Sequence, residues 1–542
     1  MADKFRTNCE ALKKHNQFLA DTIISLNNKN NSCYSAPIIA KNGESVPTLA
    51  DGKPLFSIYN PARDADNFLK DINLTEKQFI AISSLANAIH FKKALKNPNI
   101  HILVIEKNPE SIATLFEYFD FTDIFSDNFS LCCIENLETT FMNTYVPQLC
   151  GSFTHTALRS WVQYNSEAET EIQSILKKCI KIISADYSVQ AHFSKVWQRN
   201  ILRNLQILSK LPSKDLEFPL NKKAAIIGAG PSLDEGINFL KENRENHYII
   251  ATDTAWRILL QYDITADAVV TIDGQNISYR HFIDKFPDNK TLFITDLCAY
   301  PVIAEKAHKN GNPIQFIASN HPLCLLAIQY AEKHGLYFPP KIDTTSGTVT
   351  IAALDFAVKC GFKEIELFGA DFAYTNSKAY AKGSYLDPTF ENESTILNSK
   401  ETAFNTLMLR TPVVRKDKTT LTTEVLNRYA EALDNYLKNC NTDVKVSKYS
   451  QEGFIPILEK NSTGQKENVP IFLPKTLYKS FDYADFIVWV LDSLKNHDPS
   501  LTSAVLPLAA WCERTGIYNS SNNSIESVFD YAYKMAKKQL MK

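Results

Sequence analysis

The sequence predicts an α/β protein built around a Rossmann-like parallel sheet, and three observations support this prediction. Short continuous apolar runs alternate with helical segments between residues 221 and 375. Glycines and polar residues follow the ends of these runs, as is typical of a parallel sheet with helices on both faces. Regions of different pattern flank this stretch on both sides. We therefore expect a Rossmann-like central domain between a smaller N-terminal α/β domain and a mostly helical C-terminal region.

The length of 542 residues suits about three domains, at roughly 100–200 residues each. We place their boundaries where the pattern changes. The predicted regions are an N-terminal α/β domain at 1–150, a helical connector at 151–215, the Rossmann-like domain at 216–385 and a mainly helical domain at 386–542.

In the N-terminal region, two short apolar runs predict strands, at Ile100–Glu106 and Leu131–Ile134. The pattern from Glu76 to Lys96 predicts a helix. Glu106 ends its strand where a ribose-binding acid would stand. However, the loop Ala81–Ala86 has no glycine, so we interpret this half as structural.

The central region alternates strictly between strands and helices, after a connector helix at Ser188–Ser209. Helices are expected at Leu233–Asn243, Ala255–Gln261 and Thr348–Cys360, the last closed by Gly361. The expected strands are Ala224–Gly228, Tyr248–Thr252, Ala268–Ile272, Thr291–Thr295, Ile314–Ala318 and Glu364–Phe368.

Beyond this region, residues 375–420 are polar, rich in Tyr and Asn and loop-like in pattern. Residues such as Tyr380 and Tyr385 suit sugar stacking and hydrogen bonding, and the alternative is a mobile surface loop. A helix follows at Leu421–Asn439 and a strand at Asp443–Ser447. From Thr476 onward the pattern is largely helical.

Composition narrows the function classes. The formal net charge is −2, which gives no electrostatic case for nucleic acid or for an anionic membrane. No apolar run reaches the 18 residues of a membrane span, and residues 1–20 lack a signal-peptide pattern. Eleven cysteines are scattered without C-x-x-C spacing. We expect a cytoplasmic protein with reduced cysteines, no membrane insertion and no metal site.

One glycine-rich loop follows the first central strand. Gly228 and Gly230 let the backbone turn and approach a ligand closely, while Pro231 and Ser232 suit the start of a helix. Free amides and the helix dipole there favour a phosphate. The alternative is a tight strand–helix turn without a ligand. A dinucleotide fingerprint needs a third glycine where Leu233 stands, which argues against simple NAD binding.

Other polar residues follow the remaining strands, and each has an alternative, purely structural role. Asp253 stands where an acid would hold a ribose hydroxyl, or it caps the next helix. Asp273 would orient a sugar or bind a divalent ion, or it is a turn residue. Thr345, Ser346 and Gly347 open a helix as a second anion site, or they only cap it.

Two further residues complete the candidate set. Asp371 follows the last predicted strand of the central region and is a candidate sugar or metal ligand, or a solvated loop acid. His321 is the histidine at one of these strand ends, where it would serve as a general base. A helix-capping or partly buried histidine is the alternative. We take Asp273, Asp371 and His321 as catalytic candidates.

These residues lie in motifs that resemble the central domain of the motility-associated factor (Maf) flagellin glycosyltransferases, which is shared with a 6-hydroxymethylpterin diphosphokinase-like group. The segment WQRNILRNL at 197–205 resembles the helix that precedes this domain. The motifs that carry the resemblance are GAGPSLD at 228–234, ATDTAW at 251–256, ITADAVVTIDGQ at 264–275 and the stretch 345–374.

The resemblance implies transfer of a nonulosonic acid, of pseudaminic or legionaminic type, from a CMP-activated donor to Ser or Thr of flagellin. The loops at 228–232 and 346–348 would hold the nucleotide phosphate, with Asp253 near the ribose and no cofactor beyond the CMP-sugar. The alternatives are a pyrophosphokinase of the 6-hydroxymethylpterin type, with Mg²⁺ on Asp253, Asp273 and Asp371, and a non-catalytic flagellin assembly partner.

Overall fold

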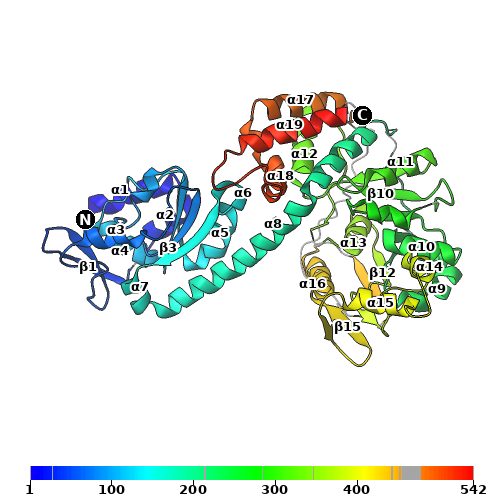
Figure 1. Ribbon diagram of the computed structural model, residues 1–542, viewed down its shortest axis with the longest axis horizontal. Helices are drawn as coiled ribbons and strands as arrows, with labels where there is room; N and C mark the ends of the chain where they lie inside the picture. Colours follow the sequence, from blue (N-terminus) through cyan, green and yellow to red (C-terminus); the bar gives the residue numbers. More distant parts are fainter. Residues whose placement is uncertain are drawn as a thin grey trace. The chain divides into compact units, whose positions relative to one another are not determined.

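The computed structural model describes residues 2–26, 28–212, 215–283, 285–345, 347–440, 444–450, 453 and 478–540. Contacts between residues divide the chain into two compact units. The first unit contains Met1–Ser194 and Leu506–Tyr531, and the second contains Lys195–Val505 and Ala532–Lys542. The long helix α8 (Ser166–Leu208) contributes to both (Figure 1). The second unit contains the whole predicted Rossmann-like domain.

The first unit is built on a four-stranded parallel sheet in the order β5-β4-β3-β6. Its strands are β3 (Gln78–Ser83), β4 (Ile100–Glu106), β5 (Phe129–Cys133) and β6 (Ser152–Ala157). An antiparallel hairpin of β1 (Tyr34–Ile39) and β2 (Ser45–Leu49) accompanies it. The helices up to α8 are α1 (Ala2–Lys13), α2 (Gln17–Ile24), α3 (Pro61–Phe68), α4 (Pro109–Tyr118), α5 (Leu137–Thr144), α6 (Pro147–Cys150) and α7 (Arg159–Tyr164).

One prediction for this unit is wrong. The segment Glu76–Lys96 was expected to be a helix, yet it begins with β3, the central strand that pairs with β4 and β6. All six residues of β3 are buried. A strand covered on both faces shows no polar alternation, so a short apolar run of this kind cannot be distinguished from a buried helix by periodicity alone.

The second unit is built on a seven-stranded parallel sheet, in the order β11-β10-β9-β8-β7-β12-β16. This confirms the predicted fold class, and the strand predictions hold to within a few residues. The strands are β7 (Lys223–Ile227), β8 (His247–Thr252), β9 (Ala268–Thr271), β10 (Leu292–Asp296), β11 (Ile314–Ile317), β12 (Glu364–Phe368) and β16 (Lys445–Lys448).

Helices cover this sheet, as the apolar character of its strands requires. The helix α13 (Val349–Cys360) packs against β7, β8 and β9, and nine of its twelve residues are buried. Figure 1 shows it beside the central strands. The other helices between strands are α9 (Leu233–Glu242), α10 (Asp253–Gln261), α11 (Pro301–Lys309), α12 (Pro322–His334) and α16 (Glu424–Asn439).

Residues 375–420 are not the loop that their polar composition predicts. The strands β13 (Tyr374–Thr375), β15 (Thr420–Thr423) and β14 (Val413–Arg415) form a small antiparallel sheet in that order. Between β13 and β14 lie two helices, α14 (Leu386–Asn392) and α15 (Lys400–Leu409). This lobe is small and largely exposed, so it carries few of the apolar residues that a periodicity argument needs.

The C-terminal part of the chain is helical, as predicted, with α17 (Tyr483–Lys495), α18 (Thr502–Arg514) and α19 (Glu526–Leu540). Within the described residues, none of these or the earlier helices combines the length and apolar character that a membrane crossing requires.

Candidate functional site

The winding of the central sheet defines where a ligand would bind. The chain runs from β7 outward through β8 to β11, then returns to place β12 on the other side of β7. In an open parallel sheet, ligands bind at the carboxyl edge next to such a reversal. The loops after β7, β8, β9 and β12 meet there, so the sheet brings most of the predicted site residues to one edge.

Backbone N–H groups of the glycine loop already donate hydrogen bonds to acceptors within the protein. Gly228 N–H donates to Phe368 O at 2.8 Å, and Gly230 N–H donates to Gly369 O at 2.7 Å. The buried Asp371 carboxylate accepts from the Ser232 backbone N–H at 2.8 Å and also from the Ser232 hydroxyl. Asp371 therefore supplies the negative charge that the N-terminus of α9 favours.

These contacts give the two glycines a packing role. A Cβ at Gly228 would lie 2.5 Å from Gly369 O, and one at Gly230 would lie 2.6 Å from both Gly369 O and the Asp371 side chain. The loops after β7 and β12 thus touch backbone to backbone. Binding of a phosphate to these amides stays a prediction, and it would require Asp371 to be displaced.

Asp253 and Asp273 follow neighbouring strands. Asp253 is buried, and its two oxygens accept from Thr254 N–H at 2.8 Å and from the Thr271 hydroxyl at 3.0 Å. The cap of α10 is instead Thr252, whose hydroxyl accepts from Ala255 N–H. Burial and, as a smaller effect, the charge of Asp273 raise the pKa of Asp253 to about 7, against the hydrogen bonds from Thr271 and Thr254. Burial also raises the pKa of Asp273.

Five further side chains interact with these two acids or with one another through their charges or rings; Tyr380 and Tyr385 belong to the stretch expected to contact a sugar, and the other three were absent from the predicted site. The rings of His281 and Tyr385 lie edge to face with centroids 4.4 Å apart. Burial raises the pKa of Tyr385; the charges of Arg280 and Arg410 lower it, while those of Asp253 and Asp273 raise it. We call the following seven residues the edge cluster: Asp253, Asp273, Arg280, His281, Tyr380, Tyr385 and Arg410.

The edge cluster is mixed in charge and ranges from buried to exposed, with Asp253 and His281 buried. Arg280 and Arg410 are exposed, while Asp273, Tyr380 and Tyr385 are partly buried. Burial raises the pKa of Tyr380 to about 12 and lowers that of His281 to about 4. The cluster can therefore offer cations to an anionic ligand, carboxylates to hydroxyl groups and a neutral imidazole as a base.

Local sequence signals did not reveal Arg280, His281 or Arg410. Tyr380, Tyr385 and Arg410 come from the lobe between β12 and α16, and they meet the sheet edge only through tertiary folding. His281 ends a 3-10 helix after β9. Its position six residues beyond Gln275, in the loop after a predicted strand, was the one usable signal.

The contacts of the remaining predicted residues are with parts of the chain outside the edge cluster. His321 caps α12, its Nδ1 accepting from Leu323 N–H at 3.1 Å, and its Nε2 is buried without a partner. Thr345 bonds to Asp343 through both its amide and its hydroxyl. Gly347 has open space around it. Ser346 lies outside the described residues.

Residues of helix α8 contact two of the loops at the carboxyl edge of the sheet. Asn200 Nδ2 donates to Gly274 O and Cys298 O, and Asn204 Nδ2 donates to Leu297 O and Ala299 O, all at 2.9–3.0 Å. The Trp197 ring lies against Gly274, where a Cβ would be 2.9 Å from it. The segment at 197–205 therefore fixes the loops after β9 and β10.

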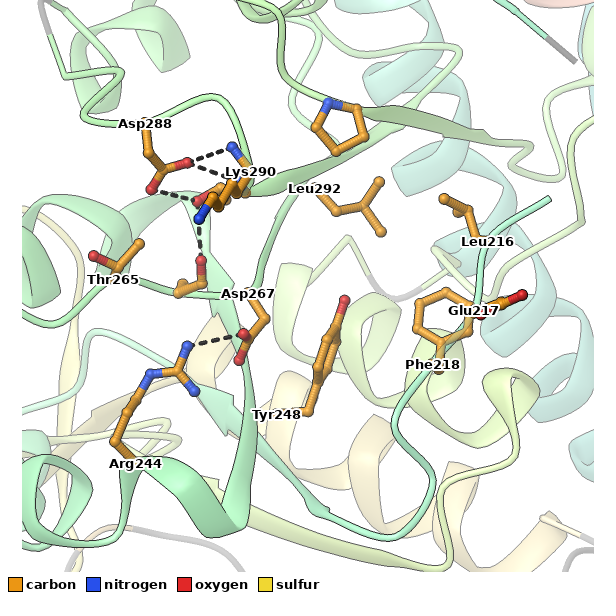
Figure 2. Close-up of a pocket in the computed structure, with 13 residues that line it drawn as sticks. Leu216, Glu217, Phe218, Arg244, Tyr248, Thr265, Asp267, Asp288, Lys290 and Leu292 are labelled. Atoms are coloured by element: carbon orange, nitrogen blue, oxygen red, sulfur yellow. Dashed lines mark hydrogen bonds and ion pairs between the residues drawn. The ribbon is translucent and has the colours of Figure 1, made fainter. Parts of the chain in front are cut away.

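A cavity of about 360 Å³ lies at the opposite, amino edge of the sheet. Figure 2 shows Phe218 and Tyr248 as its aromatic wall and Arg244 paired with Asp267 at 2.8 Å. The Asp288 carboxylate accepts from the Lys290 and Thr291 amides. These acids are held by the protein's own donors, and the cavity is separate from the edge cluster.

Among the described residues, no three His, Cys, Asp or Glu side chains come together in the manner of metal ligands. Asp253 and Asp273 follow the adjacent strands β8 and β9, whereas Asp371 accepts hydrogen bonds from Ser232.

The chain resembles known proteins in sequence and in fold. The family described as 6-hydroxymethylpterin diphosphokinase MptE-like matches residues 199–377. Two uncharacterized proteins of Treponema pallidum (strain Nichols) are 36% identical over 140 residues and 37% identical over 158 residues. These alignments cover 26% and 28% of this chain, and 67% and 54% of the respective relatives.

The fold is that of a solved structure along almost the whole chain. The structure of a Maf glycosyltransferase from Magnetospirillum magneticum AMB-1 matches with a TM-score of 0.61, covering 99% of this chain and 90% of that one. The sequence identity is 13%, so this likeness concerns the fold.

Proposed function

Because the chain belongs to the Maf family, with an MptE-like central domain, we propose that it is a cytoplasmic glycosyltransferase acting on flagellin. Its sugar would be a nonulosonic acid of pseudaminic or legionaminic type, transferred from a CMP-activated donor to Ser or Thr. The observation that supports this proposal best is the edge cluster, placed where the fold binds ligands.

The charges of the edge cluster suit such a donor. A CMP-nonulosonate carries two anionic groups close together, the phosphate and the sugar carboxylate. The charges of Arg280 and Arg410 both lower the pKa of Tyr385, so both cations lie within electrostatic reach of its hydroxyl. Guanidinium groups bind carboxylate and phosphate in bidentate fashion. Tyr380 and Tyr385 would contact the base or the sugar, and Asp253 a ribose hydroxyl.

The same residues can serve the transfer step. The acceptor hydroxyl oxygen forms a bond to the anomeric carbon, and the bond from that carbon to the phosphate oxygen breaks. The hydroxyl proton would pass to Asp273 or His281, and the electron pair leaves with CMP. Preorganised positive charge near the departing phosphate stabilises the transition state.

The decisive experiment uses purified protein with flagellin from the same organism and either CMP-pseudaminic or CMP-legionaminic acid. We expect the mass of intact flagellin to rise by whole nonulosonic acid units, with equal release of CMP. Flagellin from cells lacking this protein should lack the same mass. Unmodified flagellin with both donors would refute the proposal.

The description of the matched family favours one alternative, a pyrophosphokinase acting on a pterin alcohol. That reaction would use ATP and Mg²⁺, with Asp253 and Asp273 as candidate ligands. Thermal shift with CMP and with Mg-ATP separates the two functions, because each predicts stabilisation by one nucleotide. Binding of neither would favour a non-catalytic assembly partner.

A further inference from the structure

The two helices of the lobe form an antiparallel hairpin that joins the edge cluster to a distant tip. Tyr385 immediately precedes α14, and Arg410 immediately follows α15. The helices pack through Phe390 and Phe404, whose ring centroids are 4.9 Å apart. One end of this helical hairpin therefore carries two residues of the edge cluster, and the other end is the turn at 393–399.

That turn presents two apolar side chains fully to solvent. Ile396 and Leu397 are 104% and 96% exposed. They occupy the two middle positions of a tight turn, in which the Thr395 and Asn398 backbones each donate to the other, at 3.0 and 3.2 Å. The turn is thus held in one conformation by its backbone, and its apolar side chains contribute nothing to that hold. Adjacent exposed apolar residues on an ordered turn are typical of a contact surface.

The length of the two helices determines which molecules can contact both ends of the hairpin. At about 1.5 Å per residue, the seven residues of α14 span about 10 Å and the ten of α15 about 15 Å. A small alcohol bound beside Tyr385 cannot reach the tip. A folded protein whose Ser or Thr enters the edge cluster can cover both.

The charges around the tip indicate which kind of partner surface could bind it. Glu391, Glu393 and Glu401 flank the tip and are exposed, while the cation of Lys400 is paired with Asp387 at 2.5 Å. This acidic rim repels an anionic bilayer, and it would repel the same rim on a second copy of the chain. An apolar groove bordered by basic residues is complementary to it.

We propose that Ile396 and Leu397 dock into an apolar, basic-rimmed groove of the folded acceptor protein while its hydroxyl residue occupies the edge cluster. This inference rests on the proposed function, since it assumes a protein acceptor. It assigns acceptor recognition to a turn outside the residues that handle the sugar donor.

The test replaces Ile396 and Leu397 with Ser together and compares three rates: hydrolysis of the CMP-sugar, transfer to folded flagellin and transfer to a short flagellin peptide. We expect kcat/KM for folded flagellin to fall about 10- to 100-fold through KM, since each side chain loses its burial. CMP-sugar hydrolysis and peptide transfer should stay unchanged. Val488→Ser, at an exposed apolar position on α17, is the matched control and should change none of the three.

The outcomes separate the two proposals. If the wild-type protein transfers to neither acceptor, the proposed function fails. If the double variant transfers to folded flagellin with wild-type KM, the docking inference is overturned while the function stands. Wild-type binding to vesicles of phosphatidylcholine and phosphatidylglycerol, or a dimer that the double variant converts to monomer, would also overturn it.

Discussion

The two parallel sheets of this chain share one winding order and differ at their carboxyl edges. In each, the first strand lies inside the sheet, later strands extend to one side, and the chain then returns to the other side of the first strand. By topology alone, both edges qualify as ligand sites. The edge of the first unit is closed by buried polar contacts, whereas the edge of the second carries exposed arginines and partly buried tyrosines.

A pair of acids makes the comparison concrete. Glu106 ends β4 and Asp253 follows β8, so they occupy the same position in the two windings. Both are buried, and burial raises the pKa of each to about 7. Glu106 Oε1 accepts from Tyr34 and from Leu85 N–H, and no arginine or second acid acts on its pKa. The pKa of Asp253 is also raised by the charge of Asp273, which follows the adjacent strand β9.

The rest of the N-terminal edge is closed in the same way. The buried Ser83 hydroxyl donates to Glu169 at 2.8 Å and lies 3.0 Å from His155 Nε2. This is not a nucleophile activated by histidine, because the hydroxyl proton is directed to the carboxylate. Ser84, in the loop after β3, takes a left-handed φ of 92° where a glycine would be expected. The comparison indicates that a buried acid at the carboxyl edge is not enough for a ligand site. Accessible charged and aromatic side chains must lie near it.

The largest effect should come from the accessible acid. Asp273→Asn keeps the shape of the side chain and removes its charge, so transfer to flagellin should fall about 100-fold, or about 2.7 kcal/mol of transition-state stabilisation. The midpoint of urea unfolding should stay close to wild type, because Asp273 is only partly buried. Initial rates of CMP release with flagellin measure the effect.

Glu106→Gln is the matched control for this substitution, since it makes the same chemical change at the edge of the first unit. It should leave the rate within twofold of wild type. If Glu106→Gln lost activity as Asp273→Asn does, the closed edge would be a functional one and the contrast between the sheets would disappear.

The next effect concerns the glycine loop. Gly230→Ala places a Cβ 2.6 Å from Gly369 O, so the free energy of unfolding should fall by about 1–3 kcal/mol. Gly347→Ala is the control: its Cβ meets nothing within 4 Å, and only its φ of 75° costs stability, about 1 kcal/mol. Urea unfolding measures both. A Gly230→Ala protein of wild-type stability that no longer binds CMP would show that this glycine serves the ligand.

The sequence could predict where these loops lie but not what occupies them. The strand ends follow from continuous apolar runs and the glycines between them, which are local signals. The bond from Ser232 to Asp371 joins residues 139 positions apart, and no local pattern contains it. The same holds for Arg410 and Tyr385, which reach the edge cluster through a lobe whose polar composition resembles a loop. The local pattern therefore predicted the fold, whereas the contacts at the site depend on tertiary pairing between residues far apart in the chain.

A smaller effect should appear in the pH dependence of stability. The pKa of Glu106 rises from 4.5 to about 7 on folding, so the folded state holds an extra proton between these values. Stability from this group is complete below pH 4.5 and is lost as the pH rises through 7. Glu106→Gln should reduce the loss between pH 5 and pH 8 by about 1–3 kcal/mol, at about 1.4 kcal/mol per pKa unit. Urea unfolding at both values measures it; identical pH profiles for variant and wild type would contradict the assignment.

The smallest effect is expected at His321, which the sequence suggests as a base and the structure places as a cap. Asn at this position can accept the same bond from Leu323 N–H, because asparagine is a favoured N-cap. His321→Asn should therefore change the free energy of unfolding by less than about 1 kcal/mol and the transfer rate by less than about twofold. His281→Asn provides the comparison, since His281 faces Tyr385 in the edge cluster and should lose about 10- to 100-fold in rate if it takes the acceptor proton. Transfer rates measured from pH 5 to pH 9 distinguish the two histidines: a rate lost in His321→Asn and kept in His281→Asn would move the base two strands along the sheet, and with it the centre of the site from the end of β9 to the end of β11.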